Sequence, residues 1–152
     1  MFGGPSSQGR GRVLGLDAGE RRVGVALSDE LRLLASPLMV LDRQHGLSRV
    51  LDALVDLARR ESITRIIVGL PLNADGSSGR QARRAQNFAR LTARAVGVPV
   101  ELWDERLSTQ EAESIMRSGG RNMRRARHKG QVDAVAAAVI LQDYLDAQRR
   151  KD

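Results

Sequence analysis

Hydrophobic and polar residues follow two different periods along this chain. Three short apolar runs come first, and they predict strands at 12–17, 22–28 and 33–41. The turn at 18–21 is short enough to join the first two strands as a hairpin. The third run contains Ser36-Pro37, and proline lacks the N–H that a sheet interior requires, so this strand is expected at an edge or a bulge. Three strands with short links predict a meander.

The period changes to that of a helix after residue 46. Apolar residues recur there at i, i+3 and i+4 spacing through residue 60. The same reasoning predicts a helix over 80–96 and a last helix over 131–148, whose many alanines would let its backbone lie close to a sheet. Ser108 and Glu111 form a capping box that predicts the start of another helix.

Two further strands complete the predicted fold. The run at 65–69 is apolar throughout, as in a strand buried on both faces, and a fifth strand is expected at 98–103. The helices between these strands imply crossover connections, so the sheet should be mixed. The predicted fold is α/β, a five-stranded mixed sheet in the order βββαβαβα with helices on both faces. Residues 1–11 should be a disordered lead-in, and residues 12–152 a single domain.

Composition excludes several classes of protein. The absence of cysteine excludes a disulfide framework and a thiolate zinc site, and two histidines are too few for an all-histidine metal site. No apolar run approaches the ~20 residues of a membrane span, and residues 1–12 lack a signal-peptide core. We therefore expect a soluble, cytoplasmic protein that has no membrane partner.

The charge of the chain favours a polyanionic partner. Lys and Arg number 25 against 18 acidic residues, a net charge of +7, and such a basic chain is typical of nucleic-acid binding. Aromatic residues make up only 3%, which leaves no stacking platform for single-stranded bases. The arginines gather in the helix at 80–96 and in a loop expected to be mobile at 119–130. The candidate phosphate-binding residues are Arg80, Arg83, Arg84, Arg90 and Arg94 in the helix, and Arg121, Arg124, Arg125, Arg127 and Lys129 in the loop. The alternative is that both runs are solvated faces.

Four acidic residues lie at the ends of predicted elements. Asp17 ends the first strand, Asp104 and Glu105 end the fifth, and Asp133 opens the last helix. If the first strand is central, strands one and five can point their carboxyl ends in the same direction, where open sheets place ligands. Clustered carboxylates raise one another's pKa unless a cation neutralises them, and Mg²⁺ or Mn²⁺ prefers such oxygen ligands. Two such ions about 4 Å apart would promote phosphodiester hydrolysis. The alternative is unrelated surface acids that cap helices or form salt bridges.

Strand geometry separates two of these acids. Adjacent side chains in a strand point to opposite faces, so at most one of Asp104 and Glu105 should reach a metal. Glu105 has the longer reach and is favoured, and Asp104 would instead orient Arg106. Gly19, close to Asp17, would let a polymer backbone approach the metal, although an ordinary tight turn also uses glycine.

Five segments, in the same order, resemble the YqgF/RuvX family. They are Gly15-Leu-Asp17-Ala-Gly19, Arg22-Val-Gly24-Val-Ala26-Leu-Ser28-Asp29, Val68-Gly69-Leu70-Pro71-Leu-Asn73, Asp104-Glu105-Arg106-Leu-Ser108 and Val132-Asp133-Ala-Val-Ala136-Ala137. The resemblance spans about residues 13–145. It implies an RNase H-like fold and a divalent-metal nuclease of the group that resolves Holliday junctions and processes the 5′ end of pre-16S rRNA.

The same resemblance implies the site residues. Its acidic positions are Asp17, Glu105 and Asp133 here, which would hold the two metal ions. The residues expected to border the site are Gly19, Gly69, Leu70, Pro71 and Asn73.

Several functions remain open from the sequence. The leading hypothesis is a nuclease acting on structured nucleic acid, either a four-way DNA junction or an rRNA precursor. Symmetric cutting of a junction needs two active sites, so the DNA version predicts a homodimer, whereas RNA trimming needs only one site. One alternative is a non-catalytic nucleic-acid-binding module with an RNase H-like fold. Another is an actin-like or sugar-kinase phosphotransferase, although those folds use two such domains and 152 residues leave room for one.

Overall fold

The computed structural model describes residues 11–107 and 132–151. Its centre is a five-stranded sheet in the order β3-β2-β1-β4-β5. The strands are β1 (Arg12–Ala18), β2 (Arg22–Ser28), β3 (Ala35–Asp42), β4 (Ile63–Leu70) and β5 (Val100–Asp104). The central strand β1 pairs antiparallel with β2 and parallel with β4, and β4 pairs parallel with β5. The mixed sheet predicted from the sequence is confirmed.

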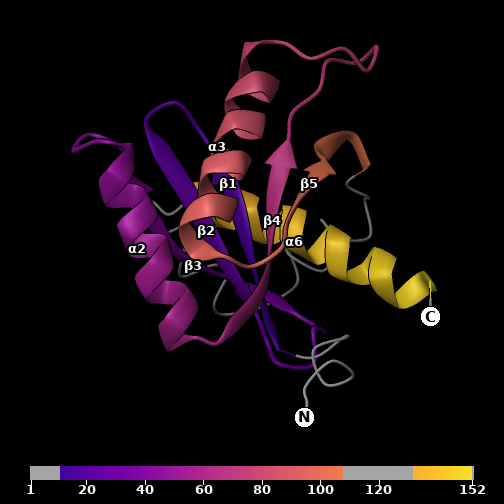
Figure 1. The fold of residues 1–152 in the computed structure, drawn as a ribbon. Helices are drawn as coiled ribbons and strands as arrows, with labels where there is room; N and C mark the ends of the chain where they lie inside the picture. Colours follow the sequence, from indigo (N-terminus) through magenta and orange to yellow (C-terminus); the bar gives the residue numbers. More distant parts are fainter. Residues whose placement is uncertain (1–10, 108–131, 152) are drawn as a thin grey trace.

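Helices cover both faces of this sheet (Figure 1). Helices α2 (Leu47–Arg60) and α3 (Arg80–Val96) pack on one face and α6 (Val132–Lys151) on the other, while η1 (Glu105–Leu107) is a single 3₁₀ turn after β5. On the first face Leu54 and Phe88 pack with Leu16, and on the second Leu141 packs with Ile67. Each such burial stabilises the fold by roughly 1.5–3 kcal/mol. Among the described residues, no helix combines the length and apolar character that a membrane crossing requires.

Helix α6 lies unusually close to the sheet because small residues meet there. A methyl group added at Gly15 would lie 2.7 Å from Leu141 Cβ, and one at Gly24 would overlap the carbonyl oxygen of Asp133. On the helix side, Ala134 and Ala137 are fully buried. The close approach predicted from the alanine-rich helix is therefore confirmed.

The structure corrects several predicted boundaries. Strand β4 begins at Ile63 rather than residue 65, and helix α6 ends at Lys151 rather than residue 148. Strand β3 begins at Ala35 rather than residue 33, because Asp29 Oδ1 accepts hydrogen bonds from the backbone N–H groups of Leu33 (2.7 Å) and Leu34 (3.0 Å) and holds them in a turn. Strand β5 begins at Val100 rather than residue 98, after a proline that cannot donate to the ladder.

Proline in β3 lies where the sequence predicted. Strand β3 is at the sheet edge, and Pro37 stands at a bulge where the register with β2 shifts. The predicted helix from Ser108, the loop at 119–130 and most of the predicted lead-in at 1–11 lie outside the described residues.

Candidate active site

Asp17 lies near the carboxyl end of the central strand, on the face that α6 covers. Its register partner in β2 is Gly24. On the other side, Gly15 pairs with Ile67 of β4, so two residues further along the same face Gly69 lies next to Asp17. Because both neighbours are glycines, there is room on each side of Asp17.

Two other acids occupy the space above these glycines. Asp133, in the first turn of α6, lies over Gly24, where an added methyl group would overlap its carbonyl oxygen. Glu105, the first residue of η1, lies over Gly69, where an added methyl group would be 2.9 Å from Oε2. The structure thus places the Glu105 carboxylate and the backbone of Asp133 over the two glycines that flank Asp17.

Burial and neighbouring negative charge raise the pKa values of two of these carboxyl groups. Burial raises the pKa of Asp17, and the negative charge of Asp133 raises it further. Burial, followed by the charges of Asp17 and Asp104, raises the pKa of Glu105 to about 7. A divalent cation would relieve this repulsion, and carboxylate oxygens are the ligands that Mg²⁺ and Mn²⁺ prefer. The carboxylate oxygens of Asp17 and Glu105 are therefore of the type that binds a hard divalent cation.

Asp133 is engaged by an arginine that sequence reasoning missed. Arg22 Nε donates a hydrogen bond of 2.9 Å to Asp133 Oδ2. Within residues 11–107 and 132–151, no three His, Cys, Asp or Glu side chains are grouped closely enough to hold one ion. The hydrogen bond between Arg22 and Asp133 joins residues 111 positions apart, so no local sequence pattern could have predicted it.

A cavity of about 590 Å³ opens beside Asp17 and Glu105. The other lining residues are Ala18, Gly19, Glu20, Pro71, Asn73, Gly79, Arg80, Gln81 and Arg84. The expected border residues Gly19, Pro71 and Asn73 are among them. Leu70 is not, because side chains alternate along β4 and Leu70 packs on the α2 and α3 face, whereas Gly69 faces Glu105. Sequence reasoning also missed Glu20, although its place in the turn after Asp17 was a usable signal.

Asp104 does not line this cavity. It forms an ion pair with Arg106 at 2.8 Å and accepts the Arg106 backbone N–H at 2.9 Å, and these hydrogen bonds hold the pKa of Asp104 below its ordinary value. Arg106 also donates to the carbonyl oxygen of Ala74 at 3.4 Å. The expected orientation of Arg106 by Asp104 is confirmed, and the pair ties η1 to the loop that carries Asn73.

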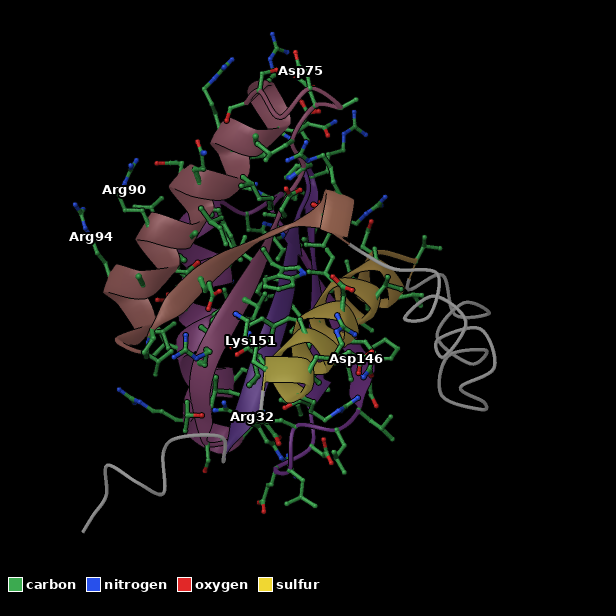
Figure 2. All side chains as sticks on the ribbon, turned by 90° about the vertical axis from the view of Figure 1, so that its right-hand side faces the viewer. Arg32, Asp75, Arg90, Arg94, Asp146 and Lys151 are labelled. Carbon is green, nitrogen blue, oxygen red and sulfur yellow. The ribbon has the colours of Figure 1, made fainter. Side chains whose placement is uncertain are left out.

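The arginines of α3 extend the basic surface away from the cavity. Arg80 and Arg84 line the cavity, and the buried face of the helix includes Ala85. Figure 2 shows Arg90 and Arg94 projecting outward from α3. Arg83 is exposed on the same helix. The candidate residues in the loop, Arg121, Arg124, Arg125, Arg127 and Lys129, lie outside the described residues.

Comparison with known proteins places the chain. Residues 11–147 match RuvX, a family described as Holliday junction resolvase. The chain belongs to the RuvX family.

Two curated relatives carry the name "Putative pre-16S rRNA nuclease". The protein of Anaeromyxobacter sp. (strain Fw109-5) is 50% identical over 137 residues, covering 90% of this chain and 98% of the relative. The protein of Chloroflexus aurantiacus (strain ATCC 29366 / DSM 635 / J-10-fl) is 44% identical over 137 residues, covering 90% of this chain and 88% of the relative.

Among solved structures, the fold of this RuvX member is similar to T. thermophilus RuvC in complex with Holliday junction substrate. The TM-score is 0.62 at 16% identity, covering 91% of this chain and 96% of the other. The match establishes an RNase H-like fold. The family and the fold that the sequence motifs implied are both confirmed.

Proposed function

We propose that this protein is a divalent-metal-dependent nuclease that hydrolyses phosphodiester bonds in structured nucleic acid. The observation that carries the proposal is the arrangement of Asp17, Glu105 and the first turn of α6, which holds Asp133, around one strand end. The three residues come from β1, η1 and α6. The Glu105 carboxylate lies over Gly69, and the backbone of Asp133 lies over Gly24. Asp17 and Glu105 also line a cavity together with Arg80 and Arg84.

In this proposal the three carboxylates hold Mg²⁺ or Mn²⁺, and we expect a pair of ions. A divalent cation bound there supplies positive charge for the attacking water and for the leaving oxygen. Near neutral pH the raised pKa of Glu105 lets its carboxyl hold a proton before the cation arrives, and cation binding would release that proton. Arg80 and Arg84 are placed to grip a phosphate beside the acids, because guanidinium groups bind phosphate with two parallel hydrogen bonds.

The outer arginines of α3 would bind the nucleic-acid backbone beyond the cut site. Arg83, Arg90 and Arg94 serve this role in our proposal, together with the loop residues Arg121, Arg124, Arg125, Arg127 and Lys129. The relatives' names point to an rRNA precursor and the family description to a four-way DNA junction. The junction substrate would require a homodimer, because symmetric cutting needs two sites, while one copy suffices for rRNA trimming.

A cleavage assay with both substrates tests the proposal. The four-way DNA junction and a structured rRNA precursor are incubated side by side with the wild-type protein and the Asp17→Asn variant, in Mg²⁺ and in Mn²⁺. We expect wild type to cleave at least one substrate, and Asp17→Asn to bind that substrate but lose cleavage. The matched control Asp56→Asn removes an exposed acid of α2, paired to Arg60, and should cleave normally.

Two results would refute the proposal. Cleavage by Asp17→Asn at the wild-type rate would remove Asp17 from the chemistry. Tight binding by wild type with no cleavage of either substrate in either metal would leave the non-catalytic binding module as the function.

A further inference from the structure

Arg22 lies near two acidic residues, Asp133 and Asp17, on one face of the sheet. Arg22 and Gly24 are two residues apart in β2, so they share the face that α6 covers. Asp133 lies over Gly24, and Asp17 is the register partner of Gly24 in the next strand. Asp133 therefore has both Asp17 and Arg22 as neighbours.

These two neighbours act on Asp133 in opposite directions. Asp17 and Asp133 both carry a carboxylate, and Asp17 is the register partner of the glycine that Asp133 covers, so two like charges are neighbours here. Arg22 Nε meets Asp133 Oδ2 at 2.9 Å and compensates its negative charge. The pair lies in solvent, with 61% of the Arg22 side chain and 38% of the Asp133 side chain exposed. An ion pair this exposed is weak enough to be exchanged for another cation.

We propose that Arg22 is a resident counter-charge for Asp133, and that a divalent cation shared by Asp17 and Asp133 must compete with it. The inference rests on the proposed function, since it takes Asp133 as a metal ligand. While Arg22 Nε donates its hydrogen bond to Oδ2, this oxygen of Asp133 is engaged by the guanidinium group. Arg22 is thus a positioning residue that acts through Asp133 and lowers the affinity for metal.

The size of the effect follows from the exposure of the pair. Exposed ion pairs change an equilibrium by a factor of about two to five, and removing a nearby positive charge also reduces repulsion of the incoming cation. Arg22→Gln should therefore bind Mn²⁺ about two- to fivefold more tightly than wild type. If Arg22 instead aimed Asp133 at the metal, the same change would weaken binding, so the sign of the effect separates the two roles.

The test is the dissociation constant for Mn²⁺, measured from the electron paramagnetic resonance of the free ion at fixed ionic strength. Arg21→Gln is the matched control, because Arg21 is exposed, adjacent, of the same charge, and forms no ion pair with any described residue. We expect a change below twofold for Arg21→Gln. In the Asp133→Asn background, Arg22→Gln should have no more effect than Arg21→Gln. Thermal melts confirm that each variant is folded.

The outcomes separate this inference from the proposed function. If Asp17→Asn leaves the Mn²⁺ affinity of the protein unchanged, the metal site itself is wrong and both proposals fail. If Asp17→Asn weakens binding but Arg22→Gln binds Mn²⁺ no more tightly than wild type, only the counter-charge role is overturned. An equal gain for Arg22→Gln with and without the Asp133 carboxylate would overturn it as well.

Discussion

Glu105 should destabilise the folded protein at neutral pH when no divalent cation is bound. Its pKa rises from the ordinary 4.5 to about 7 in the folded state. The folded state therefore binds more protons than the unfolded state between these values, so stability falls as the pH rises through this window, and the penalty is complete above about pH 7. The shift corresponds to about 3 kcal/mol, which solvent screening of this partly exposed side chain reduces to about 1–2 kcal/mol.

Glu105→Gln removes the charge while keeping the shape of the side chain. In the presence of a chelator, urea unfolding at pH 8 should show the variant about 1–2 kcal/mol more stable than wild type. Near pH 4 the difference should almost vanish, because wild-type Glu105 is then protonated in the folded state. The control Glu20→Gln removes an exposed acid from the same cavity and should stay within about 0.5 kcal/mol of wild type at both pH values.

Either of two results would refute this reasoning. Equal stability of Glu105→Gln and wild type at pH 8 would mean that the carboxylate is not strained by burial and repulsion. A difference of the same size at pH 4 and pH 8 would mean that the gain comes from packing rather than from charge.

Two other features of the molecule lead to measurable outcomes. Gly24→Ala should lower stability by about 1–3 kcal/mol in thermal or urea unfolding, because its methyl group would overlap the carbonyl oxygen of Asp133 and push α6 outward. Gly79→Ala is the control, because the added methyl group would lie 3.5 Å from the nearest atom, an ordinary contact distance. Equal stability of the Gly24→Ala and Gly79→Ala variants would contradict the close packing of α6. Replacing Arg90 and Arg94 by Gln should reduce the slope of log binding constant against log salt by about 1–2, and an unchanged slope would mean that these arginines touch no phosphate.

Helix α3 shows what a sequence can predict well. Its ends at Arg80 and Val96 match the prediction, because one face is apolar and Gly97 follows with φ of 81°, a conformation that favours glycine at a helix end. The predicted start of β3 at residue 33 was wrong for a physical reason, and the strand begins at Ala35. Leu33 and Leu34 are apolar but exposed, and the Asp29 carboxylate diverts their backbone N–H groups from the sheet.

The candidate site was predictable only in part. Asp17 and Glu105 could be chosen from their positions at strand ends. The strand alternation used to separate Glu105 from Asp104 does not apply, because β5 ends at Asp104 and Glu105 begins the 3₁₀ turn η1. The same alternation applied to β4 would have removed Leu70 from the border of the site, since Gly69 precedes it. Arg22 could not be predicted as the partner of Asp133, because the pairing depends on how closely α6 approaches β2.

The central claim is that side chains from β1, η1 and α6 hold a divalent cation. The most direct test is anomalous X-ray scattering from crystals of the full chain equilibrated with Mn²⁺. The claim predicts an anomalous peak about 2.1 Å from a carboxylate oxygen of Asp17, with Glu105 or Asp133 as a further ligand. A Mn²⁺-saturated crystal with ordered Asp17, Glu105 and Asp133 side chains and no peak between them would contradict it.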